Sequence, residues 1–131
     1  MASPRKPVLL DTCVLIDLLH GREGTAATVR GLIVQGFELT VSPINIAEVY
    51  AGMRRGEEDA TEELLAALAC PALTPEMARR AGNLVAERRR AGRTHTLDDM
   101  MIAATAIERG CTLMTANRKD FEIAELEIYE P

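Results

Sequence analysis

The fold of this chain follows from the stretch Pro7-Val8-Leu9-Leu10-Asp11-Thr12-Cys13-Val14-Leu15, in which a short apolar run ends abruptly at an acid. The apolar residues predict a buried strand, and the helical spacing of apolar side chains after Asp11 predicts a helix over residues 12–20. A continuous apolar strand is typical of a parallel sheet that helices cover. An acid beside such a strand is costly unless something pairs with it. This stretch therefore predicts an α/β fold and the first residue of a functional site.

The rest of the chain repeats the alternation of helix and strand. Apolar periodicity, caps and glycine stops predict helices over residues 25–35, 43–52, 57–69, 75–92 and 96–110. Short apolar runs predict strands over residues 37–41, 111–115 and 127–129, with residues 71–73 as a further candidate. Gly21 and Gly24 are expected to break the chain between the first two helices. These elements predict a parallel sheet covered on both faces, in a single domain over residues 1–131.

Composition narrows the class of protein. Of the 131 residues, only 3% are aromatic, so the core must be built from aliphatic side chains. No apolar run reaches the length of a membrane span, and no long apolar stretch follows the basic N-terminus as in a signal peptide. We therefore expect a cytoplasmic protein with no membrane partner. The widely spaced Cys13, Cys70 and Cys111 give neither a disulfide framework nor a zinc pattern, and we interpret them as small buried hydrophobes.

Charge gives a mixed indication about nucleic acid. The net charge of −5 argues against such a partner, because phosphate backbones normally bind basic surfaces. Arginines nevertheless gather in one predicted helix at Arg88, Arg89 and Arg90, and again at Arg54 and Arg55. They are either a solvated helix face or a surface that holds a polyanion.

Three acids occupy positions that border apolar side chains. Asp11 ends the first strand, and Glu48 and Asp99 each share a predicted helix face with apolar residues. Sites in open α/β sheets form beyond the carboxyl ends of the strands, so we expect these acids to line one crevice with Asn117. Their oxygens are hard donors that suit Mg²⁺ or Mn²⁺. The pattern therefore predicts a divalent-metal site suited to phosphodiester hydrolysis by a metal-activated water.

Each of these residues also has a purely structural explanation. Asp11 can cap the helix that follows it, and Asp99 can be the fourth residue of a capping box opened by Thr96. Glu48 lies in mid-helix, where no helix end stabilises it, but it can reach water from the edge of the apolar stripe. Asn117 is also a common turn residue. The residues alone leave both interpretations open.

Four local motifs resemble those of PIN-domain proteins and follow in the same order. Residues 9–17 form an apolar strand that ends in Asp-Thr, and residues 42–52 place a helical Glu before a small-residue turn. Residues 99–106 have the pattern Asp-X-X-Ile-Ala-Ala-X-Ala, and residues 113–121 have the pattern Leu-X-Thr-X-Asn-X-X-Asp-Phe. The chain is similar in size to the VapC-type toxins of prokaryotic toxin–antitoxin pairs.

This resemblance implies a three-layer α/β/α fold with a short central parallel sheet, and an endoribonuclease that depends on Mg²⁺ or Mn²⁺. It also implies a homodimer and a cognate antitoxin whose C-terminal segment covers the active site. Motif matching assigns the catalytic positions to Asp11, Glu48, Asp99 and Asn117, the first three as metal ligands. Asn117 falls where many relatives have Asp, and the nearby Asp120 is the carboxylate that would compensate. Thr115 would orient the site through hydroxyl hydrogen bonds.

The sequence thus predicts an endoribonuclease toxin. Candidate contacts to the RNA backbone, or to acids of the antitoxin, are Arg22, Arg54, Arg55, Arg88, Arg89 and Arg90. The alternative is a non-catalytic PIN-like module that binds RNA or protein, which Asn117 and the negative net charge permit. A receiver-like or phosphatase fold is disfavoured, because the chain lacks an acidic pair before Asp11 and a suitably placed lysine.

Overall fold

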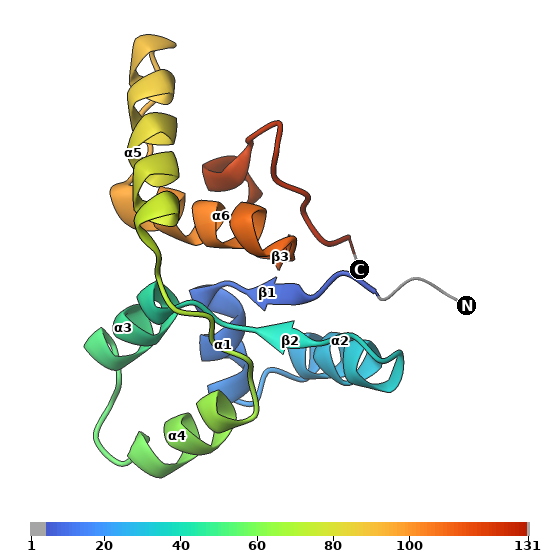
Figure 1. Cartoon of the computed structure of the whole chain (residues 1–131). Coiled ribbons are helices and arrows are strands. Elements are labelled where there is room, and N and C mark those ends of the chain that lie inside the picture. The colour runs from blue at the N-terminus through green and yellow to red at the C-terminus, as the bar shows by residue number, and fades with distance from the viewer. Residues whose placement is uncertain (1–4, 131) are drawn as a thin grey trace.

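A computed structural model of the chain describes residues 5–130 (Figure 1). Its elements are, in order, β1 (Val8–Leu10), α1 (Thr12–Leu19), α2 (Glu23–Val34), β2 (Leu39–Thr40), α3 (Pro43–Ala51), α4 (Glu58–Ala66), α5 (Pro75–Arg90), α6 (Leu97–Arg109), β3 (Thr112–Met114) and the 3₁₀ helix η1 (Arg118–Phe121). The helices follow in the predicted order, and α3 to α6 succeed one another with no named strand between them.

The strands form a parallel sheet in the order β2-β1-β3. The central strand β1 is fully buried, and its side chains alternate between two hydrophobic cores. Leu9 packs with α5 and α6 on one face, whereas Val8 and Leu10 pack with α1 and α2 on the other. Figure 1 shows these helices on opposite sides of the strands. The predicted three-layer α/β/α fold with a short parallel sheet is therefore confirmed.

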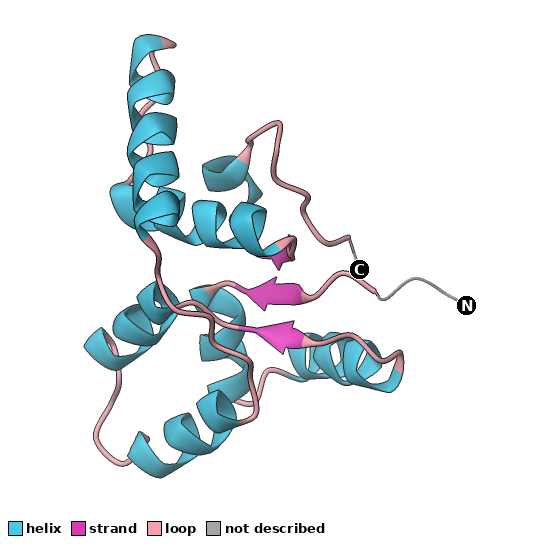
Figure 2. Cartoon of the chain, viewed as in Figure 1, coloured by secondary structure: helices cyan, strands magenta, loops and turns pink. Residues whose placement is uncertain are grey.

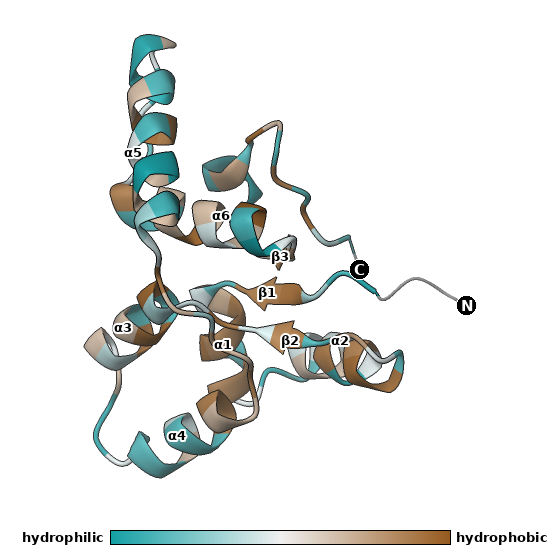
Figure 3. Cartoon of the chain, viewed as in Figure 1, coloured by the Kyte–Doolittle hydropathy of each residue, from teal (hydrophilic) through white to brown (hydrophobic). Residues whose placement is uncertain are grey.

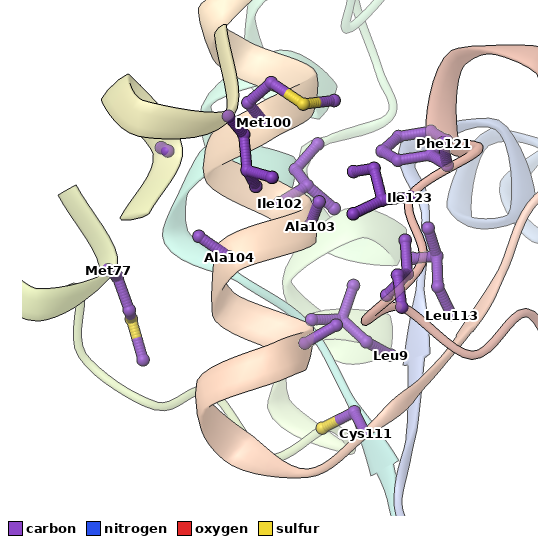
Figure 4. Packing of buried hydrophobic residues seen from close by; sticks show 14 residues of the cluster. Leu9, Met77, Met100, Ile102, Ala103, Ala104, Cys111, Leu113, Phe121 and Ile123 are labelled. Atoms are coloured by element: carbon purple, nitrogen blue, oxygen red, sulfur yellow. The ribbon is translucent and has the colours of Figure 1, made fainter. Parts of the chain in front are cut away.

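Helix α6 forms the centre of the first core. Six of its residues are buried, three of them alanines, and these small side chains let the helix pack closely on the sheet and on α5. It begins at the cap Thr96 and ends at Gly110, whose φ of +66° is the left-handed conformation that terminates helices. Figure 4 shows its buried side chains facing Leu9 and Leu113 from the sheet and Phe121 from η1. Figure 3 shows hydrophobic residues concentrated in the strands and in the adjoining helix α1, and more hydrophilic residues along α4 and α5.

Several predicted boundaries are wrong (Figure 2). Gly24 does not break the chain but lies in the first turn of α2, which starts at Glu23; glycine costs a helix about 1 kcal/mol relative to alanine, too little to stop one. The break comes at Gly21, whose φ is +69°. The second strand shrinks from residues 37–41 to Leu39–Thr40.

The predicted edge strands are also reduced. Residues 127–129 form only a single bridge, between Leu113 and Ile128, and residues 71–73 form no strand. The chain before them instead bridges Thr40 at Ala69. A short apolar run has the amino-acid composition of a strand. It forms a strand only where it is hydrogen-bonded to a neighbouring strand over several residues.

One cysteine differs from its prediction, because Cys70 is exposed while Cys13 is half buried and Cys111 is buried. In the part of the chain that the structure describes, no helix combines the length and apolar character needed to cross a lipid bilayer.

Replacing a leucine by alanine is expected to lower the free energy of unfolding more in the core than at the surface. Leu113→Ala in β3 is expected to lower the free energy of unfolding by about 2–5 kcal/mol, because Leu113 is fully buried between β1 and α6. The matched change Leu97→Ala removes the same atoms from a side chain that is 56% exposed, and is expected to cost much less. Urea denaturation of both variants measures the difference, and equal losses would contradict this description of the core.

Candidate functional site

Asp11 lies at the carboxyl end of β1, where its two oxygens have separate partners. Oδ1 accepts a hydrogen bond from the backbone N–H of Thr12 at 2.8 Å, so Asp11 caps α1. Oδ2 accepts one from the Thr115 hydroxyl at 2.7 Å. The residue is only 4% exposed. Asp11 is thus both a helix cap and a buried carboxylate tied to the loop after β3, so its two interpretations from the sequence are not exclusive.

Glu48 reaches the same end of the sheet from α3. Its side chain is half buried, and Oε1 accepts a hydrogen bond from the Thr12 hydroxyl at 2.6 Å. Thr12 directly follows Asp11, so the first two predicted acids are linked through one residue although 37 positions separate them in the chain (48 − 11).

Asp99 lies in the first turn of α6, and its backbone N–H donates to the cap hydroxyl of Thr96 at 3.1 Å. The pKa of the Asp99 carboxyl is raised, first by partial burial and then by the negative charges of Asp120, Asp11 and Glu48; hydrogen bonding to Thr96 opposes the rise. The charges of Asp120, Asp11 and Glu48 therefore all act on Asp99. The neighbouring Asp98 is exposed.

The loop after β3 contributes Thr115, Asn117 and Asp120. The Thr115 hydroxyl donates to Asp11 and accepts from the backbone N–H of Asn117 at 3.0 Å, so it connects both sides of the site. Asn117 and Asp120 are exposed, and η1 begins between them. Of the surrounding charges, Asp120 has the largest effect on Asp99. The structure thus places the charge of Asp120 where it acts on Asp99, whereas Asn117 is connected to the site through its backbone N–H and the Thr115 hydroxyl.

The sequence interpretation missed two polar residues at this site, Thr12 and Asn45. Asn45 is fully buried in α3 and donates from Nδ2 to the Thr12 hydroxyl at 3.0 Å. Its presence three residues after the predicted cap Ser42 was the available signal, since a polar residue there often completes a capping box.

Cys13 also borders the site. Its sulfur lies 3.7 Å from Asp11 Oδ2 and accepts a hydrogen bond from the Ala116 N–H at 3.4 Å. Burial raises the pKa of the Cys13 thiol, so the residue stays neutral beside the carboxylates.

The acids lack cationic partners. Across residues 5–130, none of Asp11, Glu48, Asp99 and Asp120 takes part in an ion pair. In the same residues, no three His, Cys, Asp or Glu side chains are already arranged as a metal-binding group. The hard oxygen donors and the uncompensated charge fit a divalent ion such as Mg²⁺ or Mn²⁺.

The predicted arginine contacts lie in several parts of the fold. Arg22 pairs with Asp17 at 3.1 Å, and Arg54 lines a small cavity with His20 and Glu57. Arg88, Arg89 and Arg90 occupy the last turn of α5. Figure 1 shows that end of α5 projecting away from the strands.

Fold and site together define a class: a small α/β protein with acidic side chains at the carboxyl ends of a short parallel sheet. The PIN domain family profile matches residues 8–126, and the chain belongs to that family. It is 34% identical over 113 residues to Ribonuclease VapC19 of Mycobacterium tuberculosis, which covers 86% of this chain and 90% of that protein.

Solved structures show the same similarity. A toxin-antitoxin complex from Klebsiella pneumoniae contains a chain with 28% identity and a TM-score of 0.73, over 92% of this chain and 99% of that one. VapBC2 from Rickettsia felis, bound to a DNA fragment from its promoter, has 22% identity and a TM-score of 0.81, over 93% and 96% of the two chains. At that lower identity the likeness establishes the fold alone.

Proposed function

We propose that this protein is a metal-dependent endoribonuclease that acts as the toxin of a toxin–antitoxin pair. The observation that carries the proposal is the group of carboxylates at the end of β1, in which burial and the charges of Asp120, Asp11 and Glu48 raise the pKa of Asp99. None of these acids has a cationic partner among residues 5–130. A relative of similar length is named a ribonuclease. That name favours the catalytic hypothesis over a non-catalytic module that only binds RNA or protein.

Asp11, Glu48 and Asp99 are the residues that would hold Mg²⁺ or Mn²⁺. When bound, such a cation supplies an activated water and offsets negative charge on the attacked phosphate. For the fourth position we favour Asp120 over Asn117, because the charge of Asp120 already acts on Asp99 and a carboxylate is the stronger ligand for a hard cation.

The threonines prepare these ligands. Thr115 holds Oδ2 of Asp11, and Thr12 holds Oε1 of Glu48, so each carboxylate has a fixed orientation before any cation binds. We infer that water attacks the phosphorus, the bond from phosphorus to the 3′ oxygen breaks, and that oxygen takes up a proton. The products would then have 5′-phosphate and 3′-hydroxyl ends.

The proposal includes the partners that the resemblance implies. A related chain was solved as part of a toxin-antitoxin complex, which supports a cognate antitoxin for this protein. The proposal places the pair in the cytoplasm, as the sequence predicts. Acidic residues of the antitoxin would pair with arginines such as Arg54, Arg55 and Arg88. The same arginines would also attract the phosphates of an RNA backbone. The homodimer stays a prediction, which light scattering of the purified protein tests.

Expression without an antitoxin should arrest growth. Induced alone in a bacterial host, the wild-type chain is expected to stop growth, and sequencing of RNA ends should show new 5′-phosphate termini at defined positions. The purified protein should cut the same RNA with Mn²⁺ and lose the activity in EDTA. Harmless expression of the folded protein, together with no cleavage in Mn²⁺, would contradict the proposal.

A further inference from the structure

A hydrogen-bonded chain runs from the cap of α3 into the acidic site. Ser42 N–H and the Ser42 hydroxyl both donate to Oδ1 of Asn45, at 3.1 and 2.6 Å. Nδ2 of Asn45 donates to the Thr12 hydroxyl at 3.0 Å, and that hydroxyl donates to Oε1 of Glu48 at 2.6 Å. These hydrogen bonds connect the start of α1 with α3, from the cap of α3 at Ser42 to Glu48 further along the same helix.

The direction of every hydrogen bond in this chain is fixed. A backbone N–H can only donate, so the atom of Asn45 that faces Ser42 N must be the oxygen, and the NH₂ group must face Thr12. The Thr12 oxygen therefore accepts, and its single hydrogen is left for Glu48. The amide of Asn45 thus determines which way the Thr12 hydroxyl points.

Burial makes this orientation rigid. Ser42 and Asn45 are both 0% exposed, and the Asn45 N–H returns a hydrogen bond to the Ser42 hydroxyl at 3.1 Å, which closes a capping box. A buried amide with satisfied partners cannot flip without leaving polar groups unpaired, which costs about 1–3 kcal/mol for each group. Helix capping alone needs only the oxygen of Asn45; it gives no reason for the amide to contact Thr12.

We propose that Asn45 is a positioning residue for Glu48, acting through the hydroxyl of Thr12. This inference rests on the proposed metal-dependent function and names a residue that supports its site. Asn45 orients the Thr12 hydroxyl, the hydroxyl holds one oxygen of Glu48, and the other oxygen stays available to the cation. Residues that orient a metal ligand typically change metal affinity by about 10–100-fold when they are replaced.

The first test is made without metal and leaves the cap of α3 intact. In EDTA, Glu48→Gln is expected to shift the side-chain amide N–H resonances of Asn45, because the Thr12 hydroxyl transmits the change. The same replacement in a Thr12→Val background should leave those resonances unmoved. An unchanged Asn45 amide in the first comparison, or an equal shift in both backgrounds, would overturn the inference.

The second test measures Mn²⁺ binding by calorimetry. Asn45→Asp keeps the acceptor that the Ser42 cap needs but replaces the donor that faces Thr12, and it is expected to weaken binding by about 10–100-fold. Thr12→Val should cause a similar loss and Thr12→Ser should not, and adding Asn45→Asp to Thr12→Val should cost little more. If the losses of Mn²⁺ affinity caused by Asn45→Asp and Thr12→Val were additive, the inference that Asn45 acts through Thr12 would be contradicted.

The two readouts distinguish the inference from the function on which it rests. If the wild-type protein bound no Mn²⁺, the metal site would fail, while the resonances in EDTA would still decide whether Asn45 acts on Glu48. If Asn45→Asp did not fold, the comparison of Thr12→Val with Thr12→Ser and the Asn45 resonances would carry the decision.

Discussion

Asp11→Asn is expected to reduce RNA cleavage by at least about a thousandfold while the protein stays folded. The change removes a negative charge from the centre of the acid group, and charge stabilisation by a bound cation contributes several kcal/mol to phosphodiester hydrolysis. The amide oxygen of Asn can still accept from the Thr12 N–H, so α1 keeps its cap. The hydroxyl of Thr115 can rotate to accept from the new NH₂ group.

A matched control shows whether the loss of cleavage comes from removing a charge at the site or from removing any acidic charge of the protein. Asp59→Asn makes the same chemical change at an exposed position in the first turn of α4 and is expected to leave cleavage unchanged. Steady-state cleavage of a single-stranded RNA in Mn²⁺, with circular dichroism to confirm folding, measures both variants. A folded Asp11→Asn protein that cleaves at the wild-type rate would rule out this site.

Asp99→Asn is expected to stabilise the metal-free protein while abolishing its stabilisation by Mn²⁺. Burial and the charges of Asp120, Asp11 and Glu48 raise the pKa of Asp99 in the folded state, so folding disfavours the ionised form. The contribution of Asp99 to stability is therefore fully present below the unfolded pKa of about 4 and is lost as pH rises through the folded pKa. Replacing the carboxyl by a neutral amide removes that loss, and also removes a ligand.

Asp98→Asn gives the opposite sign and serves as the control. Asp98 is exposed in the first turn of α6, where a negative charge favours the helix dipole, so its removal should lower stability slightly and leave the response to Mn²⁺ intact. Thermal unfolding in EDTA and in Mn²⁺, at pH 7 and near pH 4, makes the comparison. The gain from Asp99→Asn should shrink at the lower pH. If Asp98→Asn instead removed the response to Mn²⁺, the assignment of Asp99 would be wrong.

Local patterns in the sequence were sufficient for most of the fold. The apolar run ending at Leu10 and the cap-plus-proline signals at Ser42 and Thr74 predict elements that the structure contains at those positions. Such signals depend on neighbours within one or two turns. The predictions failed where the local signal was weak and tertiary contacts decided the structure. Gly24 was expected to break the chain but is part of the first turn of α2. Residues 127–129 were expected to form a strand but make only a single bridge.

The fourth acidic position shows a different limit. Motif matching places Asn117 there and names Asp120 as the nearby carboxylate that would compensate, and it does not choose between them. In the structure the η1 turn is closed by the hydrogen bond from Asp120 N–H to the Asn117 carbonyl at 3.0 Å, and the charge of Asp120 acts on Asp99. Which of the two residues fills the position stays a prediction. An alignment by motif does not include the path of that turn. The electrostatic effect of Asp120 on Asp99 appears only when both are placed in space.

The sequence by itself determined the order of the helices and the two-sided burial of β1, because both follow from short-range periodicity and residue type. The choice of Asp11, Glu48 and Asp99 as the acids of the site came from the motif resemblance and stays a prediction. Only the tertiary structure decided which carboxylates act on one another and which way the Thr12 hydroxyl points. Those properties depend on contacts between residues more than thirty positions apart, made by the packing of α1, α3 and α6 around one end of the sheet. Electrostatic repulsion and hydrogen-bond direction are functions of distance and angle, and no order of residues along the chain specifies either until the chain has folded.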